Sequence, residues 1–215
     1  MRCIIETKDI VLRLSRGDSF DVSYEKVSPD LFRVDRTDET IVIRQVSRTR
    51  KTTFSIGKNE AAVNVTLPAD HLKHLSVAIK AGLAEVTDIE AGFLELVVTA
   101  GMIRLTDVTA HQTSLEINAG AVHMKSVAAG QAKMDVSAGS LRSKNTTFAG
   151  GARITNKMGE VNLKGALPEG AGYSARSTLG SMKVGGQVVS GMGTIRVEGD
   201  PFFEITNMTG SVRIS

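Results

Sequence analysis

Four segments share one pattern and decide the fold: VAIKAGLAEV (77–86), LVVTAGMIRL (96–105), LEINAGAVHM (115–124) and MDVSAGSLRS (134–143). Each segment has an Ala-Gly pair at its centre, and successive pairs lie 19 residues apart three times in a row. A fixed period of this length indicates a repeat architecture, in which each unit packs against the next.

Apolar residues alternate with mixed or polar residues before each glycine. This period of two is typical of a strand that buries one face. The columns expected to face inward, read in repeat order, are Val77/Leu96/Leu115/Met134, Ile79/Val98/Ile117/Val136 and Ala81/Ala100/Ala119/Ala138.

A second short strand follows each glycine, with the form Gly-x-Φ-x-Φ, where Φ is apolar. The expected corner glycines are Gly82, Gly101, Gly120, Gly139, Gly159, Gly180, Gly193 and Gly210. A polar corner then follows at Asp88, Asp107, Ser126 and Asn145, residue types that favour turns. Two strands this short cannot bury their apolar face alone, so the units must stack. The sequence therefore predicts an all-β protein built as a single-stranded, β-helix-like solenoid with 19-residue coils.

The first 66 residues lack the 19-residue repeat but contain short alternating strands separated by turn residues. We expect an N-terminal antiparallel β region, residues 1–66, that caps a solenoid of residues 67–215, the two forming one continuous unit. Residues 69–86 also carry apolar residues at helical spacing, which leaves a helical turn near residues 70–74 as an alternative.

Two features near the C-terminus have two interpretations each. The irregular spacing after Gly159 indicates either a local cap or a solenoid end that forms a homo-oligomer interface. In the later units, Asn156, Ser177 and Asn207 take the place of the inward Ile79/Val98 column. These polar residues lie either at corners or in a hydrogen-bonded ladder inside the solenoid.

Composition excludes several classes of protein. Of 215 residues, 41% are hydrophobic and 23% charged, and no apolar stretch approaches the roughly 20 residues of a transmembrane helix. The single cysteine, Cys3, excludes an internal disulfide framework. Residues 1–6 contain no apolar signal-peptide core, so we expect a cytoplasmic protein.

The search for chemistry finds few candidates. There is no nucleophile elbow, phosphate-binding loop or zinc-protease motif, and the four histidines share no column of the repeat, so we expect neither a metal site nor a cofactor. Asp88 and Asp107 do share a column, about 4.8 Å apart if the coils stack. They are either the acids of a carbohydrate-active enzyme or hydrogen-bonding corner residues.

A cationic stripe is the most specific surface feature. The third residue after most corner glycines faces outward, and the basic members of this set are Arg104, His123, Arg142, Lys183, Arg196 and Arg213. Stacked coils would align them over a length on the order of 30 Å, able to bind an anionic polymer or glycan. The alternative is a charged face that only keeps the sheet solvated. Because no aromatic residues are interleaved, we do not expect nucleic acid as the partner. A second basic stretch covers residues 44–51.

Several motifs together resemble a known family. Leu67-Pro68 leads to Ser76-Val77 and Gly82, and Leu167-Pro168 leads in the same way to Gly180. The endings Asn156–Val161 and Asn207–Val212 share the form Asn-x-x-Gly-x-Val. Over its whole length the chain resembles the putative-adhesin domain of unknown function that is widespread in bacteria. The resemblance implies an N-terminal β region followed by β-solenoid coils, and it implies no catalytic or ligand residues. It also allows a location at the cell envelope or surface as the alternative to the cytoplasm.

Two functional hypotheses follow. The first is a non-enzymatic, adhesin-like solenoid that presents an extended surface to a protein, an anionic polymer or a glycan. The second is a carbohydrate-active enzyme that uses the Asp88/Asp107 column.

Overall fold

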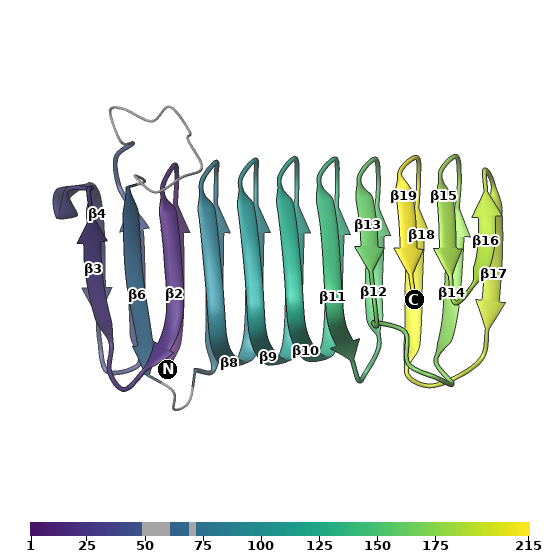
Figure 1. The fold of residues 1–215 in the computed structure, drawn as a ribbon, viewed down its shortest axis with the longest axis horizontal. Coiled ribbons are helices and arrows are strands. Elements are labelled where there is room, and N and C mark those ends of the chain that lie inside the picture. The colour runs from purple at the N-terminus through teal and green to yellow at the C-terminus, as the bar shows by residue number, and fades with distance from the viewer. Residues whose placement is uncertain (49–60, 69–71) are drawn as a thin grey trace.

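The protein is a long, two-sided stack of β-strands, described here from a computed structural model over residues 1–48, 61–68 and 72–215. Figure 1 shows the strands arranged as successive rungs along one axis. The one helical element in the described residues is a single 3₁₀ turn, Pro29–Leu31. The expected all-β solenoid is confirmed.

Three long strands form the centre of the stack: β8 (Leu83–Val98), β9 (Met102–Ile117) and β10 (Ala121–Val136). They pair in parallel with a shift of one repeat, so that Leu83 lies beside Met102, and Met102 beside Ala121. Each long strand bends in its middle, at Asp88, Asp107 and Ser126. The residues before the bend belong to one sheet, the first sheet, and the residues after it belong to the second sheet.

The remaining strands extend both sheets in an order that differs from chain order. In space, the first sheet runs β3 (Asp21–Glu25), β6 (Ala62–Pro68), β2 (Val11–Gly17), the first parts of β8, β9 and β10, β11 (Ser140–Phe148), β13 (Glu160–Leu163), β19 (Ser211–Ile214), β15 (Ser181–Val184) and β16 (Gln187–Ser190). The second sheet runs β4 (Phe32–Arg36), β5 (Thr40–Gln45), β1 (Arg2–Thr7), β7 (His74–Ile79), the second parts of β8, β9 and β10, β12 (Ala152–Asn156), β18 (Phe202–Asn207), β14 (Gly172–Ser177) and β17 (Gly193–Val197).

The N-terminal region is antiparallel only at its outer end, which corrects the expectation of an antiparallel region that precedes the coils. β1 and β2 pair in parallel on both sides and form an inner rung between β5–β6 and β7–β8. Antiparallel pairing is confined here to β3 with β6 and β4 with β5. Pairing also crosses the expected boundary, because Thr66 lies beside Ser15 and Leu67 beside Arg16. The helical turn near residues 70–74 lies partly at 69–71, outside the described residues, and β7 begins at His74.

The C-terminal end repeats this arrangement. β18 and β19 form an inner rung between β12–β13 and β14–β15. The short strands β16 and β17 form the last rung, in which β16 pairs antiparallel with β15 and β17 pairs antiparallel with β14. Figure 1 shows both chain ends inside the length of the stack. The structure shows a local cap at this end. The homo-oligomer interface stays a prediction.

Gly193 does not belong with the corner glycines, because it begins β17 and lies beside Ser177 of an antiparallel neighbour. The expectation that the alanine column faces inward is also wrong. Ala81, Ala100, Ala119 and Ala138 are exposed, since the chain has already begun to turn when it reaches them.

The two asparagines of the polar column near the C-terminus form a hydrogen-bonded ladder inside the solenoid. Ser177 lies beside Asn207 and is also buried, but its hydroxyl group makes no hydrogen bond. Asn156 and Asn207 are fully buried and lie side by side, although 51 residues separate them. Asn156 Nδ2 donates to Asn207 Oδ1 at 2.8 Å and to the carbonyl of Gly159 at 2.9 Å, while Asn207 Nδ2 donates to the carbonyl of Gly210 at 2.9 Å. The two amides therefore tie neighbouring glycine corners together.

Glycine is required at the corners because there is no space for a side chain between neighbouring rungs. A Cβ on Gly120 would overlap the carbonyl oxygen of Gly101 in the preceding rung and the Cγ1 of Val98. Gly120 is not among the residues with positive φ, so the limit is the close approach of two backbones.

Gly120→Val should lower the free energy of unfolding by about 2 kcal/mol or more, because overlap with a backbone atom cannot be relieved by a side-chain rotation. Denaturant unfolding measures this. The control is Ala119→Val at the exposed neighbouring position, expected to change stability by less than about 0.5 kcal/mol. Equal effects of the two substitutions would contradict this corner geometry.

Candidate functional site

Five of the six expected stripe residues share one column on the outer side of the first sheet. In spatial order, the column is Arg104, His123, Arg142, Asn162, Arg213 and Lys183, and each residue lies beside the next. Arg213 precedes Lys183 because β19 is inserted between β13 and β15. The insertion therefore joins two cationic residues that 30 residues separate in the chain.

Arg196 does not belong to this column. It lies on β17 of the second sheet, beside Ser174, and its Nε is 2.7 Å from a carboxylate oxygen of Glu198. The expectation failed because Gly193 begins an antiparallel strand, so the third residue after it does not follow the repeat.

A second cationic column, missed in the sequence analysis, runs beside the first. Lys125 lies beside Lys144, and Lys164 follows on the next rung, immediately after β13. These lysines lie two residues beyond His123, Arg142 and Asn162, on the same face of the sheet. The 19-residue step from Lys125 to Lys144 was the signal that would have found them. The name cationic face is used below for the two columns together: Arg104, His123, Lys125, Arg142, Lys144, Lys164, Arg213 and Lys183.

Two acidic residues adjoin the cationic face, and both are engaged in ion pairs. Glu85 is held between Arg104 at 3.0 Å and Arg13 at 3.4 Å. Glu160 pairs with Arg142 at 2.8 Å. Within the described residues, the three lysines of the second column, together with Lys183 and Arg213, make no ion pair. The face therefore carries a net positive charge.

His123 lies between Arg104 and Arg142 at the centre of the first column. Partial burial lowers the pKa of its imidazole, and the positive charges of the two arginines lower that pKa further. At neutral pH the charge of this column therefore comes from its arginines and lysine rather than from the histidine.

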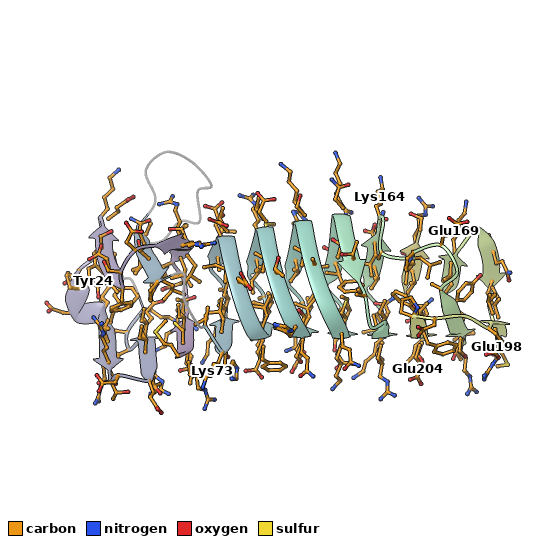
Figure 2. All side chains as sticks on the ribbon, turned by 90° about the horizontal axis from the view of Figure 1, so that it is seen from below. Tyr24, Lys73, Lys164, Glu169, Glu198 and Glu204 are labelled. Atoms are coloured by element: carbon orange, nitrogen blue, oxygen red, sulfur yellow. The ribbon has the colours of Figure 1, made fainter. Side chains whose placement is uncertain are left out.

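The outer side of the second sheet has a different character. Lys133 pairs with Asp135 at 3.3 Å and Arg153 with Glu204 at 2.8 Å. Figure 2 shows Lys164 and Glu204 projecting from opposite sides of the stack. Each of these two cations is thus compensated by an acidic partner, unlike the lysines of the second cationic column.

Asp88 and Asp107 lie in one exposed column, which continues as Ser126 and Asn145. All four residues have φ between 53° and 54°, in the left-handed region. Asp and Asn tolerate this conformation better than most residues, so the bend itself explains the composition of the column. A shallow depression of about 390 Å³ lies on the second sheet near Lys133, Arg153 and Glu204, and neither aspartate lines it.

The other candidates give no site in the described part of the chain. No group of three or more histidine, cysteine or acidic residues there is arranged to hold a metal ion. No helix in that part is long and apolar enough to cross a membrane. The basic stretch at 44–51 lies partly outside the described residues, and Arg44 within it pairs with Glu6 at 3.0 Å.

The fold defines the chain as a two-sided β-solenoid with a cationic face. Its sequence places it more specifically: the Toastrack family (DUF4097) matches residues 4–199, and the chain belongs to that family. The expected family resemblance is thereby confirmed. No curated protein matches the chain. Among solved structures, it is similar to a putative cell adhesion protein from Clostridium sporogenes, with 12% identity, a TM-score of 0.40 and coverage of 99% of this chain and 90% of that one.

Asp107→Asn should leave the free energy of unfolding within about 0.5 kcal/mol of the wild type, since asparagine also tolerates the left-handed bend. Asp107→Val should cost about 1–2 kcal/mol, because a β-branched side chain is strained there. Thermal unfolding of both variants measures this. If Asp107→Asn instead abolished hydrolysis of a polysaccharide by the wild-type protein, the carboxylate would be catalytic.

Proposed function

We propose that this Toastrack protein is a non-enzymatic, adhesin-like module that binds an anionic polymer along the cationic face of its first sheet. The polymer is one with repeated phosphate, sulfate or carboxylate groups. The observation that carries the proposal is the alignment of eight basic residues on one side of the stack, six of which make no ion pair within the described residues: His123 and five lysines and arginines.

The regular spacing of the rungs supports a repeating ligand. Six consecutive rungs carry the first column, and at about 4.8 Å per rung they span about 24 Å. A rigid row of this length can contact several charged groups of one chain at once, so individually weak contacts add up.

The arrangement of like charges also supports a binding role. Lys125 and Lys144 lie directly side by side, and like charges in this position destabilise a sheet. Neither lysine is needed for packing, because both are exposed. A bound anion would remove the repulsion and gain the attraction of both charges.

The non-enzymatic part of the proposal is supported by the left-handed bend at Asp88 and Asp107, which gives both residues a structural role. The polymer part is supported by the absence of aromatic rings from the cationic face. Such rings are needed to stack on bases, and a backbone of charged groups needs none.

The triple variant Lys125→Gln, Lys144→Gln and Lys164→Gln should bind polyphosphate about tenfold more weakly, since three exposed charge contacts contribute ~0.5 kcal/mol each. Titration of polyphosphate at low ionic strength measures this, and wild-type affinity should fall as salt is added.

The matched control is Lys73→Gln, Lys80→Gln and Lys133→Gln. These exposed lysines belong to the second-sheet side of the coils, and their loss changes the net charge by the same amount. The control should keep nearly all of the wild-type affinity. Equal losses in the two variants would show that net charge acts rather than the cationic face, and would overturn the proposal.

A further inference from the structure

A ridge of exposed apolar side chains runs along the glycine-corner edge near the C-terminal end of the stack. The name apolar ridge is used for Met158, Leu179, Met192 and Met208, which are 69%, 73%, 83% and 47% exposed. Met158 and Leu179 stand directly before a corner glycine, a position that small alanines occupy in the central coils, as at Ala119 and Ala138. Large apolar side chains therefore begin where the regular repeat ends.

Backbone hydrogen bonds place the four residues in neighbouring turns. The amide of Met208 donates to the carbonyl of Asn156, two residues before Met158, and the amide of Leu179 donates to the carbonyl of Met208. The amide of Gly191, next to Met192, donates to the carbonyl of Gly180, next to Leu179. The ridge thus spans the last four rungs, up to the β16–β17 cap at the end of the stack in Figure 1.

Charge is distributed unevenly around this end of the molecule. Lys157 adjoins the ridge, and Lys183 and Arg213 follow within four residues of the neighbouring corner. The acidic residues Glu198 and Asp200 lie at the edge opposite to the apolar ridge. There, the amide of Asp200 donates a hydrogen bond to the carbonyl of Gly170, just before β14 begins. Figure 2 labels Glu169 and Glu198 at this end. The six residues of β14 separate the two edges by about 20 Å.

We propose that the apolar ridge docks on an anionic lipid bilayer. The ridge is formed by the projecting tips of turns, a shape that enters an interface rather than receiving a partner's side chain. Methionine and leucine side chains would enter the boundary between headgroups and acyl chains, while Lys157, Lys183 and Arg213 contact the anionic headgroups. The acidic edge would point away from the membrane. The site shares Lys183 and Arg213 with the cationic face but differs from it in its chemistry, since its binding also depends on apolar side chains.

Vesicle sedimentation tests the proposal. The wild type should sediment with vesicles that contain 30 mol% phosphatidylglycerol, a composition of about one-third anionic lipid chosen to attract the basic residues. The triple variant Met158→Ser, Leu179→Ser and Met192→Ser should partition at least about tenfold more weakly, although its charge is unchanged. Its polyphosphate binding should stay at the wild-type level, which separates the ridge from the cationic face.

The matched control is Val34→Ser, Val46→Ser and Phe202→Ser, which removes three exposed apolar side chains that lie away from the ridge. It should sediment as the wild type does. A wild type that stays in the supernatant, or equal loss in the two triple variants, would overturn the proposal.

A fluorescent probe tests insertion directly, because the chain contains no tryptophan. The tryptophan emission of the Leu179→Trp variant should shift to the blue when anionic vesicles are added. The emission of the control variant Val46→Trp should not shift. A blue shift of Leu179→Trp that grows with protein concentration in the absence of vesicles would identify a second copy of the chain as the occupant and would refute the lipid proposal.

Discussion

In-register parallel pairing between rungs is the constraint on which the rest of the molecule depends. It places each residue beside its equivalent in the next rung, so any property of one position is repeated along the stack. At the corner this leaves no space for a side chain beyond glycine, as the contact of Gly120 with Gly101 shows. At the bend, this pairing places residues with a left-handed backbone conformation in one column. On the outer face, it places charged side chains of successive rungs in one column. The same strand pairing therefore determines both the fold and the arrangement of charged side chains on the surface.

The sequence predicts the fold well where the coils follow each other in the chain. The 19-residue step identifies the central strands, and Asp88 and Asp107 were correctly taken as candidates for a polar corner. The insertion of both chain ends was not predictable, because β12 and β18 pair across 51 residues with no periodic signal between them. The repeated Asn-x-x-Gly ending at Asn156 and Asn207 was the one trace of that pairing, since the two amides bond to each other inside the solenoid.

The residues of the candidate site were likewise predictable only where their rungs follow each other in the chain. Arg104, His123 and Arg142 were predictable as neighbours, because their rungs are consecutive in the chain. Arg196 was assigned wrongly, since counting from a glycine assumes a parallel strand and β17 is antiparallel. The lysine column was missed because the count stopped at the third residue after each glycine. The apolar ridge depends on rung order as well, so sequence periodicity alone does not reveal it.

The order of the rungs at the C-terminal end is the claim on which both proposed surfaces rest, and disulfide formation measures it most directly. Asn162 lies beside Arg213 and two rungs from Lys183, about 4.8 and 9.6 Å away at the usual strand spacing. A disulfide tolerates the first Cα separation and not the second. The variant Asn162→Cys with Arg213→Cys should therefore cross-link under mild oxidation, while Asn162→Cys with Lys183→Cys should not, and buried Cys3 should not react in either. Cross-linking of the second pair and not the first would mean that the rungs follow chain order, and would contradict the account.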